Sequence, residues 1–356
     1  MSPGRRTVLG IAAAALGTAA AGGTALVQRR RIRTRRADGR PGEFGSLRSD
    51  PVTIVASDGI KLYAEVDEAT DHADGPTLVF VHGYALNLDC WHFQRAHFRG
   101  ERRMVFYDQR SHGRSKRSTK GNATIDQLGH DLKCVLDQLA PDGRVVLIGH
   151  SMGGMTIMAL ADQRPDLFGE RVVGAVLIGT SAGRLIDIGT ALSTRATALL
   201  TNQILPRLQG IATRRAALVE RGRRIGSDVS FLINRFTGFG ANASPAQVEF
   251  VERMIAATPI DVISSFSGTF PVHDKFDALT TLGSVPVLVL AGGDDRLTPL
   301  SHAREITARA TGAELVTFDG AGHMVMFERA PLVNLHLRAF LRRAMRGGRR
   351  TAARGA

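Results

Sequence analysis

The stretch Gly149-His150-Ser151-Met152-Gly153-Gly154 decides the fold of this 356-residue chain. The apolar run 145–148 precedes it, and the helix-like run 155–161 follows it. A Gly-x-Ser-x-Gly pattern between a strand and a helix requires a tight turn with the serine at its apex, and the glycines allow close backbone approach. The amides of the following helix then point at negative charge that develops beside the serine. The stretch therefore predicts a nucleophilic serine at the carboxyl end of a buried strand.

Short apolar or β-branched runs recur around this motif, between stretches with helical spacing such as Thr124–Leu139 and Ser301–Ala310. This alternation is typical of a mostly parallel sheet covered by helices on both faces. The runs Val52–Val55 and Ile60–Val66 flank a turn at Ser57-Asp58-Gly59 and predict an antiparallel lead-in. We therefore expect an α/β fold with eight strands. The six remaining strands are predicted at Thr77–Val81, Met104–Tyr107, Val145–Ile148, Val172–Ile178, Val285–Leu290 and Glu314–Phe318.

The interval between the strands at Val172–Ile178 and Val285–Leu290 is far longer than one crossover helix requires, at roughly 100 residues. We expect residues 182–284 to form a helical cap over the carboxyl edge of the sheet, where open α/β sheets bind their ligands. Helical spacing occurs at Leu192–Leu205, Thr213–Val219, Asp228–Phe236 and Pro245–Ala257.

The formal net charge of +13 is confined to the two ends of the chain. Residues 1–50 hold ten arginines against three acidic residues, and residues 341–356 hold six arginines and no acidic residue. The body at 51–340 is therefore close to neutral. A nucleic-acid enzyme would carry its positive charge on the folded face that meets phosphate, so we expect no nucleic-acid partner.

The N-terminal segment Thr7–Val27 contains no charged residue and is long enough to span a bilayer. Arg5 and Arg6 before it also resemble a twin-arginine export signal. The arginine cluster that follows at 29–36 resists translocation and favours an uncleaved anchor with the body on the cytoplasmic side. We expect membrane association through residues 1–28 and their basic flank, with export to the cell envelope as the alternative.

The organisation that follows has five parts. An anchor or signal segment at 1–28 leads into an Arg-rich linker at 29–50. The α/β core occupies 51–181 and 285–340, the cap 182–284, and a basic disordered tail 341–356. Cys90 and Cys134 show no spacing typical of metal binding or of a disulfide framework.

Candidate partners for Ser151 follow two later strands. A serine hydroxyl needs a base within hydrogen-bond reach and an acid that orients the base. The loop 292–299 holds Asp294 and Asp295, and the loop 320–323 ends in His323. The chain order Ser, Asp, His is the order that accompanies a nucleophile elbow.

Four motifs together resemble the α/β-hydrolase fold superfamily, in its capped group of serine esterases, lipases and haloperoxidase-like enzymes. The resemblance covers roughly residues 51–340 and implies an α/β-hydrolase fold, which supports many reactions. The motifs are His82-Gly83-Tyr84, the stretch Tyr107-Asp108-Gln109-Arg110-Ser111-His112-Gly113-Arg114-Ser115, the elbow at 149–154, and the two loops that carry the aspartates and His323.

By this resemblance Ser151 is the nucleophile and His323 the general base. Asp295 is the expected acid, because it fits the family spacing of glycine, two residues, aspartate, three residues and proline. Asp294 is the runner-up. The backbone amides of Tyr84 and Met152 would form the oxyanion hole, since one donor follows the nucleophile and the other follows the His-Gly pair.

Other polar side chains near these motifs are interpreted as structural. His82 and His150 match no base of the family. Ser111 stands where the family usually has glycine, a departure that concerns the local turn and leaves the triad intact. We interpret Asp108, Arg110, His112 and Ser115 as groups that order their loop, and Trp91 as core or pocket wall.

A serine at the elbow disfavours epoxide hydrolases and haloalkane dehalogenases, which resemble this group but use aspartate there. We expect a carboxylic ester hydrolase that acts on a small apolar acyl substrate through an acyl-enzyme. No metal-ligand cluster, phosphate loop or dinucleotide fingerprint occurs, so no cofactor is expected. The apolar cap residues behind the substrate prediction are Ile204, Leu205, Phe231, Leu232, Ile233, Phe236 and Phe239.

Several alternatives use the same scaffold. A cofactor-free haloperoxidase or perhydrolase, a C–C bond hydrolase and a thioesterase would all need the same triad. A membrane-tethered binding protein on a non-catalytic hydrolase scaffold would not need it. The sequence does not predict the oligomeric state.

Overall fold

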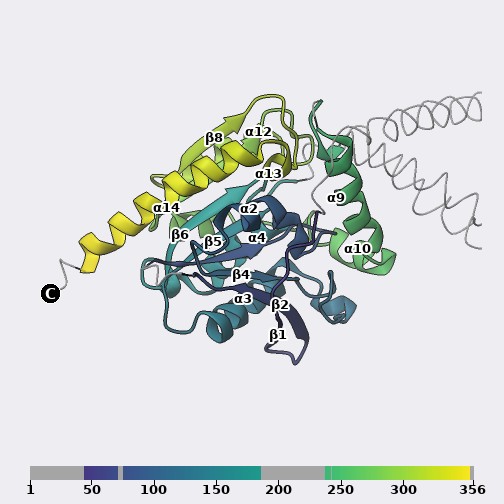
Figure 1. Ribbon diagram of the computed structural model, residues 1–356, viewed down its shortest axis with the longest axis horizontal. Coiled ribbons are helices and arrows are strands. Elements are labelled where there is room, and N and C mark those ends of the chain that lie inside the picture. The colour runs from purple at the N-terminus through teal and green to yellow at the C-terminus, as the bar shows by residue number, and fades with distance from the viewer. Residues whose placement is uncertain (1–43, 71–74, 186–236, 242, 353–356) are drawn as a thin grey trace, which may run out of the picture. The chain divides into compact units, whose positions relative to one another are not determined.

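The structure is a computed structural model that describes residues 44–70, 75–185, 237–241 and 243–352. Its centre is one eight-stranded sheet with the strand order β1-β2-β4-β3-β5-β6-β7-β8, which confirms the expected fold class (Figure 1). Strands β1 and β2 and strands β2 and β4 pair antiparallel, and every other neighbouring pair is parallel. The strands are β1 (Pro51–Val55), β2 (Lys61–Asp67), β3 (Thr77–Val81), β4 (Met104–Tyr107), β5 (Val145–His150), β6 (Val172–Ile178), β7 (Val287–Gly292) and β8 (Glu314–Phe318).

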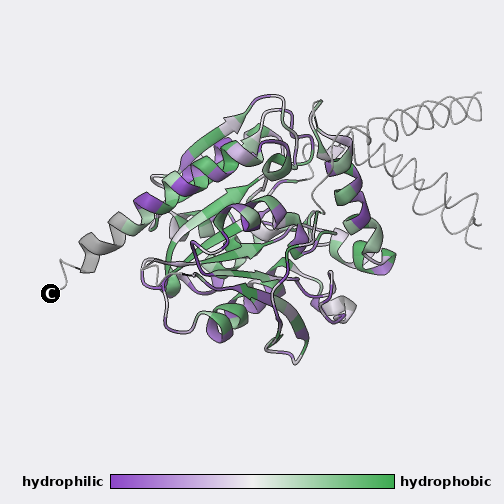
Figure 2. Cartoon of the chain, viewed as in Figure 1, coloured by the Kyte–Doolittle hydropathy of each residue, from purple (hydrophilic) through white to green (hydrophobic). Residues whose placement is uncertain are grey.

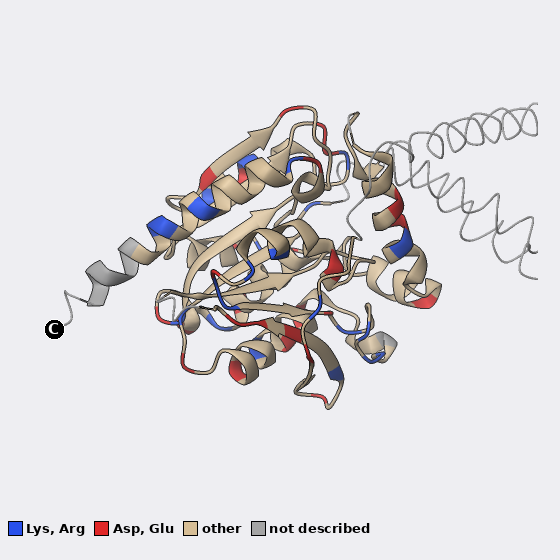
Figure 3. Ribbon diagram, in the orientation of Figure 1, with Lys and Arg blue, Asp and Glu red and all other residues tan. Residues whose placement is uncertain are grey.

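The central strands bury every residue, which explains why they are continuous apolar runs in the sequence. The edge strands β1 and β8 keep exposed positions. Figure 2 shows the hydrophobic colour concentrated in the sheet, and Figure 3 shows most charged residues outside the central strands. Burial on both faces therefore fixes the sheet as the core of the molecule.

Helices cover both faces of the sheet. Helices α3 (Ile125–Leu139), α4 (Met152–Gln163), α11 (Ala278–Leu282) and α12 (Leu300–Arg309) pack together on one face. Helices α2 (His92–Phe98), α13 (Val325–Glu328) and α14 (Ala330–Ala352) lie on the other, where Phe340 of α14 contacts Gly174 of β6.

The described part of the predicted cap, residues 182–284, contains helices α9 (Pro245–Ala257), α10 (Ile260–Ser267) and α11, of which α9 and α10 follow one another directly along the chain (Figure 1). Helix α11 packs on α4 and so belongs to the core. The helix predicted at Pro245–Ala257 is confirmed with those bounds. Ser244 caps it, because its side chain accepts the Gln247 amide and the Gln247 side chain accepts the Ser244 amide. The helices predicted at Leu192–Leu205, Thr213–Val219 and Asp228–Phe236 lie outside the described residues.

The C-terminal boundary differs from the prediction of a disordered tail at 341–356. Helix α14 continues to Ala352. Phe340, Leu341 and Ala344 are buried, and Phe340 and Ala344 lie beside Gly174 of β6. An apolar stripe at helical spacing thus holds the helix on the sheet although arginines occupy its other positions.

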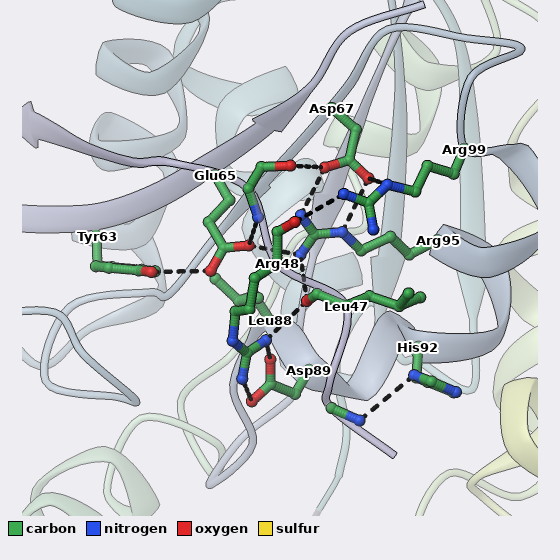
Figure 4. Close-up of polar contacts among 12 residues, drawn as sticks. Leu47, Arg48, Tyr63, Glu65, Asp67, Leu88, Asp89, His92, Arg95 and Arg99 are labelled. Carbon is green, nitrogen blue, oxygen red and sulfur yellow. Dashed lines mark hydrogen bonds and ion pairs between the residues drawn. The ribbon is translucent and has the colours of Figure 1, made fainter. Parts of the chain in front are cut away.

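The N-terminal boundary also differs, because residues 44–50 of the predicted linker pack on the body (Figure 4). Ser49 donates its amide to Glu65 Oε2 (3.0 Å) and its hydroxyl to Asp67 Oδ1 (2.5 Å). The guanidinium of Arg95 donates to the same two carboxylates and to the Leu47 carbonyl (3.1 Å). The segment therefore completes the hydrogen bonds of a buried ion cluster.

In the part of the chain that the structure describes, no helix is long and apolar enough to cross a membrane. The apolar segment Thr7–Val27 lies outside that part.

Replacing Arg95 by Met should destabilise the fold strongly. The side chain of Arg95 is 2% exposed between Glu65 and Asp67, so its loss leaves two buried carboxylates without their cation. We expect the free energy of unfolding in urea to fall by about 3–5 kcal/mol. Arg164→Met, which removes an exposed ion pair with Asp166, is the matched control and should cause no measurable change. Equal unfolding free energies for both variants would show that the buried cluster matters no more than a surface ion pair.

Candidate active site

Ser151 lies at the turn between β5 and α4 with φ 53° and ψ −118°, a backbone conformation that is strained for any residue except glycine. Its amide donates to the Ile178 carbonyl of β6 (2.9 Å), and its carbonyl accepts from Gly154 (2.9 Å). A Cβ atom on Gly153 would collide with the Val81 carbonyl oxygen. The glycine pattern of the sequence therefore reflects the close approach of α4 to the ends of the strands.

Asp295 and His323 form a buried hydrogen-bonded pair. Asp295 follows β7 and His323 follows β8, and Nδ1 of His323 lies 2.9 Å from Asp295 Oδ2. Asp295 also accepts from the amides of Leu297 (2.8 Å) and Thr298 (2.9 Å) and from the Thr298 hydroxyl (2.8 Å). Because a carboxylate only accepts, Nδ1 of His323 carries the proton and Nε2 is left as the basic nitrogen.

The charge of Asp295 is stabilised in place. Burial on its own raises the pKa of this carboxyl, but the His323 ring and the hydrogen bonds from His323 and Thr298 outweigh burial, so the pKa is lowered. Asp294, the runner-up from the sequence, is exposed, and its amide donates to the Ala321 carbonyl (2.9 Å). The geometry pairs His323 with Asp295.

Ser151 and His323 lie at the same edge of the sheet, and His150, the residue before Ser151, contacts His323. The rings of His150 and His323 lie 4.7 Å apart, and Nε2 of His150 donates to the His323 carbonyl (3.1 Å). A Cβ atom on Gly179, just after β6, would lie 3.4 Å from both His323 Nδ1 and Asp295 Oδ2. The structure thus brings the three predicted triad residues to the carboxyl ends of β5, β7 and β8.

The two predicted oxyanion residues flank Ser151. A Cβ atom on Gly83 would lie 3.2 Å from the Cβ atom of Ser151, so the loop that carries Tyr84 runs directly beside the serine. Met152 is the first residue of α4, and the amides of a first helical turn have no acceptor within the helix. Both backbones therefore lie beside Ser151, as the prediction of an oxyanion hole requires.

A buried polar network supports this loop. Nδ1 of His82 donates to the Gly83 carbonyl (2.7 Å), and Nε2 accepts from the Gln109 amide (2.9 Å). The Gln109 side chain donates to the His82 carbonyl (2.6 Å) and accepts from Thr156 of α4 (2.9 Å). Burial lowers the pKa of His82 to about 3, so the ring is neutral and can accept as well as donate. The contacts agree with the structural interpretation of His82.

The loop after β4 matches its predicted ordering role. Asp108 accepts the amides of Leu88 (2.7 Å) and Arg114 (2.7 Å). Ser111 has φ 67°, in the left-handed region that favours glycine, and its hydroxyl accepts the Ser118 amide (2.9 Å). The remaining contacts are those of Arg110 with Asp58 and Asp131, of Ser115 with Asp108, of His112 with the Arg110 carbonyl, and of buried Trp91 with Phe80.

Sequence reasoning missed three positioning residues, Thr298, Gln109 and Glu328. Glu328 accepts the amide of Gly322, next to His323, and the amide of Gly240 in the predicted cap, both at 2.8 Å. It thus joins the His323 loop to the cap segment. Glu328 lies five residues after His323, and no pattern in a single sequence marks that position. Among the described residues, no group of three or more His, Cys, Asp or Glu side chains could hold a metal ion.

Three buried histidines make stability depend on pH. Burial lowers the pKa of His82 and His150 to about 3 and that of His112 to about 4, against an ordinary value of about 6.5. Between these values the unfolded chain binds more protons than the folded protein, so stability is lost as the pH falls. Burial raises the pKa of Asp108 to about 6, which acts in the opposite direction and offsets about one proton.

We therefore expect the free energy of unfolding to fall as the pH is lowered from 7 to 4, with these four groups contributing about 3 kcal/mol per pH unit near pH 5. Equilibrium urea unfolding at pH 7.5, 6 and 5 measures this slope. His112→Asn keeps a donor toward the Arg110 carbonyl but does not titrate in this range, so its slope should be smaller by about one proton. A stability that does not change between pH 7.5 and 5 would refute the assignment of neutral buried histidines.

Comparison with known proteins adds three relatives. The chain is 28% identical over 293 residues to 3-oxoadipate enol-lactonase 2 of Acinetobacter baylyi, covering 82% of this chain and 96% of that protein. It is 28% identical over 300 residues to a non-heme chloroperoxidase of Streptomyces lividans, covering 82% and 99%. It is 29% identical over 270 residues to the dihydrolipoyllysine-residue acetyltransferase component of the acetoin cleaving system of Pseudomonas putida, covering 76% of this chain but only 64% of that protein.

A solved structure shares the fold. A thermophilic esterase from Thermogutta terrifontis superposes with a TM-score of 0.64 and 24% identity, covering 83% of this chain and 99% of that one. The family model described as the alpha/beta hydrolase fold matches residues 76–330, the range that contains the elbow, the Asp295–His323 pair and all parallel strands. Because this match extends over more than half of the chain, the chain belongs to the alpha/beta hydrolase family.

Proposed function

We propose that this chain is a serine hydrolase of carboxylic esters in which Ser151, His323 and Asp295 form the catalytic triad. The observation that carries the proposal is the buried Asp295–His323 hydrogen bond at the sheet edge where Ser151 holds its strained turn. Membership of the family supports a hydrolase, and the esterase and enol-lactonase relatives support ester chemistry, since a lactone is a cyclic ester.

The reaction follows from the proton positions. Nε2 of His323 accepts the Ser151 proton as the serine oxygen attacks the ester carbonyl, and the Asp295 carboxylate stabilises the imidazolium that forms. The amides of Tyr84 and Met152 stabilise the oxyanion of the tetrahedral intermediate. His323 then protonates the leaving alcohol, and a water molecule activated by the same ring releases the acid from the acyl-enzyme.

An apolar acyl group suits the described surroundings of the site. The side chain of Met152 belongs to a buried apolar cluster with Met155, Val262 and Phe266, against which Tyr84 also packs. Of the cap residues that suggested an apolar substrate, Phe239 is described and buried, and the other six lie outside the described residues.

The second candidate function is peracid formation, which the similarity to a non-heme chloroperoxidase favours. A perhydrolase uses the same triad but transfers the acyl group to hydrogen peroxide. Bromination of a reporter dye in the presence of acetate, bromide and peroxide distinguishes it from an enzyme that only hydrolyses esters.

Membrane attachment is a separate part of the proposal. It rests on the sequence of Thr7–Val27 and its basic flank, and fractionation of the full-length protein tests it. Equal recovery of the full chain and a chain without residues 1–42 in the soluble fraction would contradict it.

Replacing Ser151 by Ala should abolish turnover of p-nitrophenyl esters and labelling by a fluorophosphonate probe, because both need the serine oxygen. Ser181→Ala is the matched control, since the Ser181 hydroxyl lies 2.9 Å from His302 Nδ1 and is another buried serine beside a histidine. The control should keep the label. Full turnover by Ser151→Ala, or a wild-type protein that hydrolyses no ester and takes no label, would refute the proposal.

Replacing Asp295 by Asn should lower kcat on the order of a thousandfold or more. The amide nitrogen of asparagine would meet Nδ1 of His323 and favour the tautomer whose Nε2 cannot accept a proton. Asp294→Asn changes the neighbouring exposed carboxylate and should keep kcat within about twofold of wild type. Steady-state kinetics on one p-nitrophenyl ester compares the two, and a larger loss in Asp294→Asn would reverse the assignment of the acid.

A further inference from the structure

The side chain of Tyr84 makes contacts that are separate from the proposed role of its backbone amide. Its hydroxyl donates to the Ile263 carbonyl of α10 (2.5 Å), and the ring of Phe270 packs against its ring edge to face, with the centroids 5.0 Å apart. Burial raises the pKa of the Tyr84 hydroxyl well above its ordinary value, so it remains a donor at every working pH. Tyr84, whose backbone amide is assigned to the oxyanion hole, is thus hydrogen-bonded to the cap through its side chain.

A second bond joins the same loop to the same segment. The Thr258 hydroxyl, between α9 and α10, donates to the Ala85 carbonyl (3.1 Å), with the Met254 carbonyl of α9 slightly farther away (3.3 Å). Ala85 has φ 57°, so its backbone stands in the left-handed region and needs support from its surroundings. The segment 258–263 therefore bonds the loop at two successive residues, 84 and 85.

Packing links the other oxyanion residue to α10 as well. The buried cluster around α10 contains Val262 and Phe266 together with Met152, and Tyr84 packs against it. Thr269, just after α10, accepts the Ile125 amide of α3 (3.2 Å), which fixes this segment to the core. Tyr84 is thus bonded to α10, and the side chain of Met152 shares a buried cluster with residues of the same helix.

We propose that Tyr84 is a positioning residue. Its hydroxyl, together with Thr258, holds the loop that carries Tyr84 and Ala85 against α10. The position of α10 then determines where the Tyr84 amide lies in the oxyanion hole. The inference rests on the proposed function for the role of the Tyr84 amide. When α10 moves away from the core, the hydrogen bonds of the Tyr84 and Thr258 hydroxyls break, and the strained backbone at Ala85 can relax. The amide of Tyr84 then moves away from the oxyanion while Met152 stays at the start of α4.

The decisive variant is Tyr84→Phe, which removes one hydroxyl and keeps the ring. We expect kcat on p-nitrophenyl esters to fall by roughly tenfold to a hundredfold with KM within about twofold, because the oxyanion donor matters most in the transition state. A trifluoromethyl ketone, which forms the oxyanion on the serine, should lose affinity in parallel. Tyr63→Phe is the matched control: the Tyr63 hydroxyl also makes a hydrogen bond, to Glu65 Oε1 (2.8 Å), but β2 lies away from the site, and kcat should not change.

A second measurement does not depend on catalysis. Amide hydrogen exchange over residues 83–86 should be faster in Tyr84→Phe and in Thr258→Val than in wild type, with the melting temperature used to exclude global unfolding. The double variant should lose little more activity than either single variant, because both bonds support one loop.

Two results would contradict the proposed role of the Tyr84 hydroxyl. Unchanged kcat and unchanged exchange in Tyr84→Phe would show that the hydroxyl supports nothing. A raised KM with unchanged kcat would make the hydroxyl a substrate contact. A wild-type protein that hydrolyses no ester and takes no fluorophosphonate label would instead refute the proposed function, and the exchange data would still report on the role of the Tyr84 hydroxyl.

Discussion

The backbone of Ser151 holds a conformation that costs about 1–3 kcal/mol, and the surrounding sheet is what maintains it. The turn is closed by the Ile178 carbonyl of β6 and by Gly154 of α4, while Gly153 lets α4 pass within contact of the Val81 carbonyl at the end of β3. Three parallel strands and one helix therefore constrain one residue. The fully buried apolar strands supply the rigidity, because none of them can shift without exposing a face to water.

Burial also decides where charge resides in the site. His82, His112 and His150 surround the catalytic edge, and the pKa of each is lowered mainly by burial, so they act as neutral hydrogen-bonding groups. Asp295 is equally buried, yet four hydrogen bonds and the His323 ring keep its pKa low. The environment thus keeps one carboxylate charged beside one histidine and keeps the other three rings uncharged. The three residues proposed as the triad are distinguished by these surroundings as well as by their order in the sequence.

Much of this could be predicted from the sequence, and the misses have physical causes. Strands buried on both faces are apolar runs, so β3, β4 and β6 have the predicted bounds, whereas β7 begins two residues later than expected, at Val287. The turn at Ser151 could be predicted because α4 packs so closely against the strand ends that only glycine fits at Gly153. Adjacent residues in one loop do not reveal which carboxylate is buried, so the sequence favoured Asp295 over Asp294 through the family spacing alone, and in the structure Asp295 is the buried carboxylate beside His323.

The boundaries and the supporting polar residues depend on contacts between distant parts of the chain. Residues 44–50 belong to the body because their backbone groups form hydrogen bonds with the buried side chains of Arg95 and Glu65. These two side chains also pair with each other. Glu328 and Gln109 act through single hydrogen bonds to backbone amides and carbonyls, for which a lone sequence carries no pattern.

The two backbone amides that the proposal assigns to the oxyanion hole are held in place by different parts of the protein. Met152 begins α4 and is held by the core, so its amide is fixed whenever the protein is folded. Tyr84 lies in a loop whose bonds reach the segment 258–263. An oxyanion held by one donor instead of two is stabilised on the order of a hundredfold less. In the proposed function, the core thus holds the nucleophile, the base and one of the two oxyanion donors, and the segment 258–263 supports the other donor. A substrate that presses α10 onto the loop would strengthen its own transition state.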